Sequence, residues 1–313
     1  MQQLQFRLAK LPALPFTVSS WLNIGAGPDV INAFRAKSLD LADNAGIPPI
    51  QAHYQGFEAK IVAIDVTRKP NYLFATRPGS DIHTVADFKG KRLAFSQGGQ
   101  AQGVVLLRAL KQAGLAYKEV KLVPLTSNQF LTALQSGQVD VAPLANNQAP
   151  AYLKQYGAKV PAPSPPTSWT CSNCCGRRSP CSPTGPRPPP SPRTSRTGPG
   201  GLVWQWEHPD VWNREFYVKT QNLTLAQAEA VTKLANKPLF PPSWDEAIRW
   251  EQETADLLAE GGFVKKFKVD SLFDRRFESL AADAYRRSTG GEGRDHHRSH
   301  DLDGLHGLDG RRG

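Results

Sequence analysis

Cysteine is absent from most of this sequence, and long apolar runs are absent throughout. All four cysteines, Cys171, Cys174, Cys175 and Cys181, lie between residues 161 and 200, so no disulfide framework can hold the rest of the fold. No apolar run approaches the ~18 residues that a transmembrane helix requires. Residues 1–14 contain two cations but neither a continuous apolar core nor a small-residue cleavage pattern. The sequence as written therefore shows no export signal.

The motifs of common enzyme classes are also missing. There is no GxSxG, no HExxH and no P-loop, and the glycines at 98, 99 and 103 lack the spacing of a dinucleotide fingerprint. His53, His83 and His208 are isolated from one another in the sequence. The cysteine window lacks the second correctly spaced pair that a zinc site needs. We therefore expect no catalytic constellation, no cofactor and no metal site.

The positive charge is concentrated in one window. The net charge is +10 and the isoelectric point is near 9.5, which alone would suggest a nucleic-acid or membrane partner. Residues 161–200 contain five arginines, no lysine and no acid, so half of the excess lies in forty residues. The rest of the chain is only modestly basic, and we expect no nucleic-acid partner.

The same window has the composition of a disordered segment. Twelve prolines and seven serines occur in residues 161–200, and apart from Trp169 the window has little to bury. Such a segment cannot bury enough apolar area to offset the entropy lost on ordering. Its bias towards Pro, Arg, Ser, Cys and Gly is typical of an alternative reading frame of GC-rich DNA. We therefore predict a disordered, frameshifted passage over residues 161–201.

Elsewhere the apolar pattern predicts strands that alternate with helices. Such alternation implies an α/β fold with parallel sheets. In these sheets, ligands bind at the carboxyl ends of strands, where the next helix begins. The predicted strands are residues 16–22, 39–42, 60–66, 71–76, 91–96, 120–125 and 139–142. The predicted helices are residues 30–36, 50–55, 101–112, 128–135, 211–218, 225–235, 243–259 and 278–287.

Three Gly-rich or polar turns occupy the same place, each directly before a predicted helix. They are residues 25–29, 43–48 and 96–100. If these turns converge, their free backbone N–H groups and helix dipoles would form an anion site without a charged side chain. For any one turn, the simpler interpretation is that Gly and Pro residues merely separate a strand from a helix, as they do throughout α/β folds. Three turns in one topological position favour a site.

Several strings of residues resemble a known family. They are GAGP (residues 25–28), LDLA (39–42), GIPP (46–49), VADFKGKRLA (85–94), ALQSGQVD (133–140) and FDRRF (273–277). Together they resemble the aliphatic-sulfonate-binding proteins, within the nitrate/sulfonate/taurine class of ABC-transporter solute-binding proteins. The likeness covers about residues 16–160 and 202–277. It implies a two-lobed type II periplasmic-binding fold, in which each lobe is a mainly parallel sheet flanked by helices.

The resemblance also implies a domain plan and a function. The first lobe would comprise residues 1–78 and the helices of 202–287, and the second lobe residues 79–160, followed by a disordered tail over 288–313. The protein would be a monomeric, non-enzymatic periplasmic component that captures an alkyl sulfonate or a related small oxyanion between its lobes and delivers it to an ABC permease. The ligand-binding residues would be Gly25, Ala26, Gly27, Asn44, Ala45, Gly46, Ser96, Gln97, Gly98, Gly99, Gln100, Asn146 and Asn147.

The sequence departs from the family at two places. It begins near the end of the family's first helix, so the first strand and helix of the first lobe are expected to be missing. The second crossing between the lobes should lie where residues 161–200 stand. We therefore expect weak or absent ligand binding, and a cytoplasmic protein if the chain is expressed in this form.

Two alternatives on the same scaffold remain open. A pyrimidine-precursor synthase of the thiamine pathway would need histidine or cysteine chemistry in the cleft. A ligand-sensing regulatory domain would need a DNA-binding module. Neither requirement is met by the three turns or by the ends of the sequence.

Overall fold

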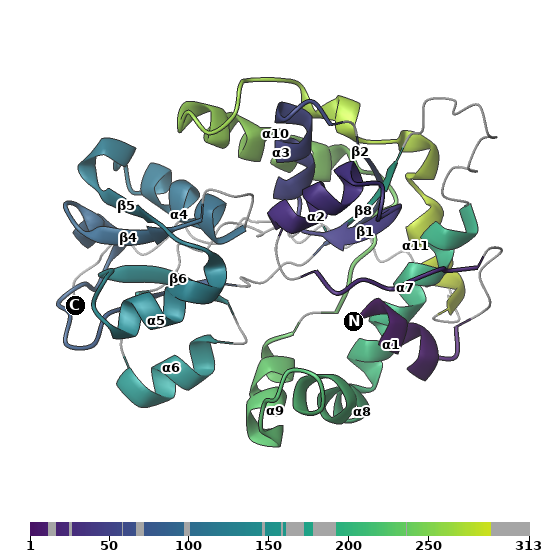
Figure 1. Cartoon of the computed structure of the whole chain (residues 1–313), viewed down its shortest axis with the longest axis horizontal. Coiled ribbons are helices and arrows are strands. Elements are labelled where there is room, and N and C mark those ends of the chain that lie inside the picture. The colour runs from purple at the N-terminus through teal and green to yellow at the C-terminus, as the bar shows by residue number, and fades with distance from the viewer. Residues whose placement is uncertain are drawn as a thin grey trace, which may run out of the picture.

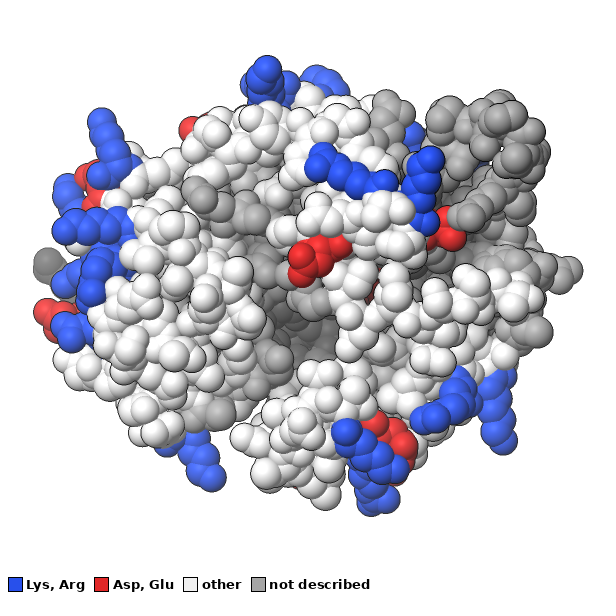
Figure 2. All heavy atoms as spheres, viewed as in Figure 1, with Lys and Arg blue, Asp and Glu red and all other residues white. Residues whose placement is uncertain are grey.

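The computed structural model describes residues 1–11, 17–24, 27–57, 59–66, 72–96, 101–145, 148–157, 159–160, 172–177, 192–235 and 237–288. These residues form two lobes, each with its own sheet (Figure 1). A space-filling view shows a hollow between the two lobes on the face presented in Figure 2. The α/β fold predicted from the alternating pattern is confirmed.

The first lobe is built on a three-stranded sheet of order β1-β8-β2. Its strands are β1 (Leu41–Asn44), β8 (Ser172–Arg177) and β2 (Ala59–Asp65). The strand β8 runs antiparallel to both neighbours. The helices α2 (Gly27–Arg35) and α3 (Ile47–Tyr54) pack against each other, and α3 packs on β2.

The second lobe has a five-stranded sheet of order β5-β4-β6-β3-β7. Its strands are β3 (Tyr72–Thr76), β4 (Arg92–Phe95), β5 (Lys121–Pro124), β6 (Val141–Ala145) and β7 (Lys159–Val160). Its helices are α4 (Ala101–Gln112), α5 (Phe130–Gln135) and α6 (Ala149–Tyr156). The strand β4 is parallel to β5 and β6, and β3 is antiparallel to β6 and β7. One strand in each sheet runs opposite to all the others, β8 in the first and β3 in the second, so the expectation of mainly parallel sheets is confirmed.

The remaining helices come mostly from the C-terminal third. They are α1 (Gln2–Leu8), α7 (Pro192–Glu207), α8 (Pro209–Trp212), the π-helix η4 (Asn213–Val218), α9 (Leu225–Leu234), α10 (Asp245–Glu260) and α11 (Leu280–Ser288). The short 3-10 helices η5 (Val269–Leu272) and η6 (Arg275–Phe277) pack on β2. Thr224 caps α9 by accepting a hydrogen bond from the backbone N–H of Gln227, as the sequence predicts for this residue.

Two elements lie in the window whose composition predicts no element. The strand β8 lies between β1 and β2, and α7 begins at Pro192 and packs on α11. A strand that pairs with a neighbour on each side is held by backbone hydrogen bonds, which do not depend on the types of its side chains. An unfavourable amino-acid composition therefore does not exclude a strand here. The strand β7 belongs to the second sheet and β8 to the first. The expected second crossing between the lobes falls on residues 161–171, which lie outside the described residues.

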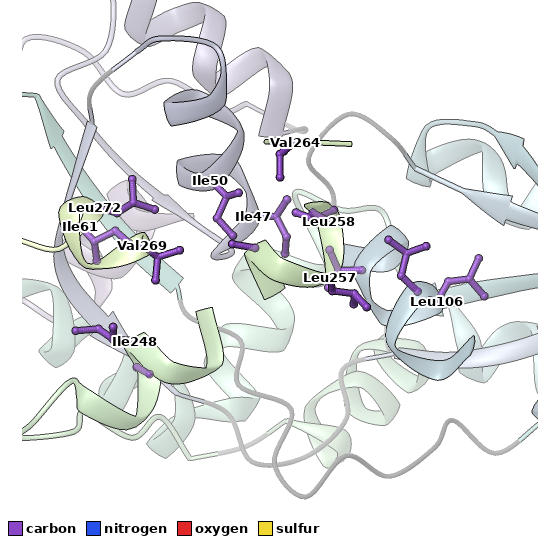
Figure 3. Close-up of a cluster of buried hydrophobic side chains, with 14 of the residues drawn as sticks. Ile47, Ile50, Ile61, Leu106, Ile248, Leu257, Leu258, Val264, Val269 and Leu272 are labelled. Atoms are coloured by element: carbon purple, nitrogen blue, oxygen red, sulfur yellow. The ribbon is translucent and has the colours of Figure 1, made fainter. Parts of the chain in front are cut away.

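The helix α10 links the cores of the two lobes. Trp244, Ile248, Ala255 and Leu258 lie on one buried face of this segment, as the sequence predicts. One hydrophobic cluster contains residues of α3, α10 and α4 together. Figure 3 shows this continuity, with Ile47, Leu258 and Leu106 coming from the three helices. The lobes therefore share apolar contacts through α10.

Asp140 joins three segments of the second lobe immediately before β6. Its carboxylate accepts hydrogen bonds from the Arg92 backbone N–H at 2.9 Å, from Arg92 Nε at 3.1 Å and from Arg92 Nη2 at 2.8 Å. Arg77 Nε lies 3.2 Å from the same carboxylate. The hydrogen bonds from Arg92, assisted by the charges of Arg92 and Arg77, lower the pKa of Asp140. The network fastens the start of β6 to β4 and to the end of β3.

We predict that Asp140→Asn lowers the free energy of unfolding by about 1.5–3 kcal/mol at pH 7, because it removes a mostly buried, charge-assisted acceptor. The folded-state pKa of Asp140 lies below its unfolded value, so its stabilisation is present at neutral pH and is lost as pH falls through the folded pKa. Denaturant unfolding of both proteins at several pH values measures this difference. Asp81→Asn is the control, because Asp81 is highly exposed and 4.0 Å from Lys91. Equal losses in the two variants would contradict the prediction.

Candidate functional site

Two of the predicted turns lie close to α10, one through its own glycine and the other through the helix that follows it. Asn44 ends β1, Ala45 follows, and Gly46 is the N-cap residue of α3. Ser96 follows β4 and precedes α4. The helix α4 packs on α10, and the Glu251 side chain of α10 meets Gly46. The start of α3 in one lobe and the helix α4 in the other therefore both lie next to α10.

The second-lobe turn is held by a close approach of strand and helix. The Gly103 backbone N–H donates to Ser96 Oγ at 3.2 Å, and Ser96 is buried. A Cβ atom placed on Gly103 would lie 2.5 Å from the Ser96 carbonyl oxygen. Only glycine leaves room for this contact, which fixes the direction in which α4 leaves the turn. Beside it, Ser127 Oγ donates to the buried Gln102 Oε1 at 2.8 Å, a polar pair that sequence reasoning missed.

We predict that Gly103→Ala is destabilising by more than about 1 kcal/mol, although alanine normally stabilises a helix interior by about 0.5–1 kcal/mol relative to glycine. The reason is the 2.5 Å contact with backbone, which cannot move aside as a flexible side chain can. Thermal unfolding measures the effect. Gly200→Ala in α7 is the matched control, because its added Cβ would meet only the flexible end of Leu11 at 3.1 Å. A Gly103→Ala protein as stable as the control variant would refute the proposed constraint.

A buried acid lies at the start of α3. Glu251 is 2% exposed, and its Oε1 atom has no hydrogen-bond partner among the described residues. A Cβ atom on Gly46 would lie 2.5 Å from Glu251 Oε2 and 2.8 Å from Oε1, so the carboxyl is packed directly on this glycine. Burial raises the pKa of Glu251 to about 8, and the charge of Arg108 opposes the rise only partly. The side chain is therefore largely neutral at pH 7.

Arg108 brings the nearest cation from the other lobe. Its guanidinium carbon lies 3.6 Å above the ring centre of Trp250. Nη2 donates to Thr254 Oγ1 at 3.1 Å and Nη1 to Glu253 Oε2 at 3.3 Å. Burial lowers the pKa of Arg108, but arginine stays protonated in proteins. These contacts hold α4 against α10. The charge of Arg108 also lowers the pKa of Glu251.

The described residues around the hollow are mostly uncharged, but acidic side chains lie at its upper edge in Figure 2. Lys and Arg side chains lie farther from the hollow on this face. An anion bound in the hollow would therefore depend on backbone N–H groups at helix N-termini for its contacts.

Only part of the predicted site can be placed. Gly27 begins α2, Asn44 pairs with Asn173 of β8, and Ala45, Gly46 and Ser96 lie in the turns already described. The other predicted ligand-binding residues lie outside the described part of the chain: Gly25, Ala26, Gln97, Gly98, Gly99, Gln100, Asn146 and Asn147. Glu251 and Arg108 were not predicted, because an isolated acid or arginine on an amphipathic helix gives no sequence signal for burial.

No helix in the described ranges is both long and apolar enough to cross a bilayer. The same ranges contain no group of three or more His, Cys, Asp or Glu residues placed to hold a metal ion.

Glu251 generates a stability prediction that is independent of any ligand. Its folded-state pKa of about 8 exceeds the ordinary value of 4.5, so the folded state resists ionisation. Stability associated with the neutral acid is full below about pH 4.5 and is lost progressively as pH rises from there to about 8. We predict that the wild-type protein loses on the order of 4 kcal/mol relative to Glu251→Gln between acidic pH and about pH 9.

Denaturant unfolding across this pH range provides the measurement. Glu246→Gln is the control, because Glu246 lies exposed in the first turn of the same helix. Parallel stability profiles for wild type and Glu251→Gln would show that Glu251 ionises normally in the folded protein.

Two α/β lobes, each with helices that begin at strand ends, form a two-lobed α/β fold with a hollow between the lobes. Comparison with known proteins supports this assignment at the level of sequence. Residues 23–175 match the family model described as "NMT1/THI5 like". Over 146 residues the chain is 34% identical to an aliphatic sulfonates-binding protein of Escherichia coli (strain K12), covering 47% of this chain and 46% of that protein. The chain thus spans about half the length of this curated relative.

Solved structures agree. The periplasmic aliphatic sulphonate binding protein SsuA from Escherichia coli is 25% identical, with a TM-score of 0.67 and 80% coverage of both chains. The alkanesulfonate-binding protein SsuA from Xanthomonas axonopodis pv. citri, solved with bound MOPS, is 22% identical. Its TM-score is 0.70, and the match covers 82% of this chain and 87% of that one. The predicted resemblance to the aliphatic-sulfonate-binding proteins is confirmed.

Proposed function

We propose that this protein is the solute-binding component of an ABC importer and that it captures an alkyl sulfonate in the hollow between its lobes. The observation that carries the proposal is the 34% identity to an aliphatic sulfonates-binding protein over 146 residues, together with a two-lobed fold that matches SsuA. The ligand would be released to a membrane permease, and the protein would act as a monomer in the periplasm.

The described geometry is compatible with an oxyanion ligand. A sulfonate presents three acceptor oxygens and one negative charge, which suit backbone N–H groups at helix N-termini. In the described residues α2 and α3 begin in the first lobe and α4 in the second, each at or beside a predicted ligand-binding turn.

The positions of the described histidines favour binding over catalysis. His53 stacks on Phe267 with ring centres 4.3 Å apart, and His208 stacks on Trp204 at 4.7 Å. His83 is exposed. The contacts that define the two described turns, from Glu251 to Gly46 and from Gly103 to Ser96, involve no histidine base of the kind that a synthase on this scaffold would need.

Isothermal titration of the purified chain with C2–C6 alkanesulfonates tests the proposal. We expect saturable binding at one site per chain, strengthening with alkyl length as more apolar surface is buried. Alkanols of equal length are the matched controls and should give no saturable heat, because they lack the oxyanion. Absence of binding by every sulfonate would contradict the proposed function.

A further inference from the structure

The first turn of α3 is poor in hydrogen-bond donors. Gly46 is its N-cap residue, and Ile47, Pro48 and Pro49 occupy the first three helical positions. A helix normally offers the unpaired N–H groups of its first turn to an anion. Because proline has no N–H, this turn retains only the donors of Gly46 and Ile47. An oxyanion at this helix end would find fewer donors than the sequence pattern suggests.

The Glu251 side chain packs on the N-cap residue of this donor-poor turn. Its two carboxyl oxygens pack on Gly46, at 2.5 and 2.8 Å from the point where a Cβ atom on this residue would stand. The side chain is 2% exposed, and Oε1 has no partner among the described residues. A buried polar atom without a partner costs free energy, which a structure tolerates when a ligand supplies the partner. In its neutral form a carboxylic acid carries an O–H that can donate to an oxyanion.

Titratable and charged groups lie on three elements that neighbour α10: α4, α3 and η5. From α4 come Arg108, which acts on Glu251 electrostatically, and Lys111, which pairs with an acid at the end of α10. On α3, His53 stacks against Phe267. From η5 comes Asp270.

Two further acids stand close in the sequence or structure. Glu253, on α10 itself, is paired with Arg108. Asp43, on β1 ahead of the turn, is hydrogen-bonded to the Gln2 side chain, and burial raises its pKa. Among these groups, Arg108 is the one whose charge lowers the pKa of Glu251. This lowering is smaller than the rise in pKa that burial causes.

We propose that Glu251 is a ligand-binding residue of the interlobe site, and that it donates a hydrogen bond in its neutral form to the sulfonate at the start of α3. This inference rests on the proposed function and adds a residue to its site. The O–H of Glu251 takes the place of the N–H groups that Pro48 and Pro49 lack. Above about pH 8 the side chain ionises, loses its donor and places a second negative charge beside the ligand.

The experiment is calorimetric titration with hexanesulfonate at about pH 6.5 and about pH 9, on either side of the titration of Glu251. Four proteins are compared: wild type, Glu251→Gln, Glu251→Leu and Glu246→Gln. Glutamine keeps a donor and cannot ionise, whereas leucine fills a similar volume without a donor. Glu246→Gln controls for removal of a charge from the same helix. Thermal unfolding of each protein confirms that it is folded.

We expect wild type and Glu246→Gln to lose about tenfold or more in affinity between the two pH values. Glu251→Gln should bind within a few-fold of wild type at the lower pH and keep that affinity at the higher one. Glu251→Leu should bind about tenfold or more weakly at both.

A folded Glu251→Leu protein that binds as tightly as wild type would assign Glu251 a purely structural role and overturn the inference, while leaving the proposed function intact. Affinity of the wild type that does not change with pH would also overturn it. If no protein binds hexanesulfonate at either pH while all are folded, the proposed function fails and this inference fails with it.

Discussion

The burial of α10 between the lobes is the constraint on which the rest of the structure depends. Its apolar face joins the Ile47 side of α3 to the Leu106 side of α4 in one continuous cluster. Arg108 reinforces the junction through Trp250 and Thr254. Because the two sheets are separate, this helix is what places the start of α3 in one lobe beside a helix of the other.

The same packing explains why an acid can be kept neutral at this junction. A helix whose face is apolar on both sides of Glu251 excludes water from the carboxyl, and the nearest arginine already donates to Glu253 and Thr254. Burial therefore dominates and raises the pKa of Glu251 to about 8. The glycine opposite is required by the same contact, since a side chain at position 46 would overlap the carboxyl. Gly46 and Glu251 are thus best understood as one unit.

Much of the fold could be predicted from local patterns. The helix α4 spans the predicted residues 101–112, Thr224 caps α9, and the tryptophan-bearing face of α10 is buried, because periodicity and capping are local properties. The strand β8 could not be predicted, because its pairing with β1 and β2 is set by distant backbone. For the site, the sequence identified the turns at Gly46 and Ser96 from their position before helices. It missed Glu251, whose burial depends on which helix packs over the turn.

The most direct test is a crystal structure of the full chain with hexanesulfonate bound. We expect the sulfonate group to lie between the lobes, in contact with the backbone N–H groups of Gly46 and Ile47, with a Glu251 oxygen about 2.5–3.0 Å from a sulfonate oxygen. A sulfonate group bound elsewhere on the protein, with the Glu251 carboxyl still packed on Gly46 and unpartnered, would contradict this expectation.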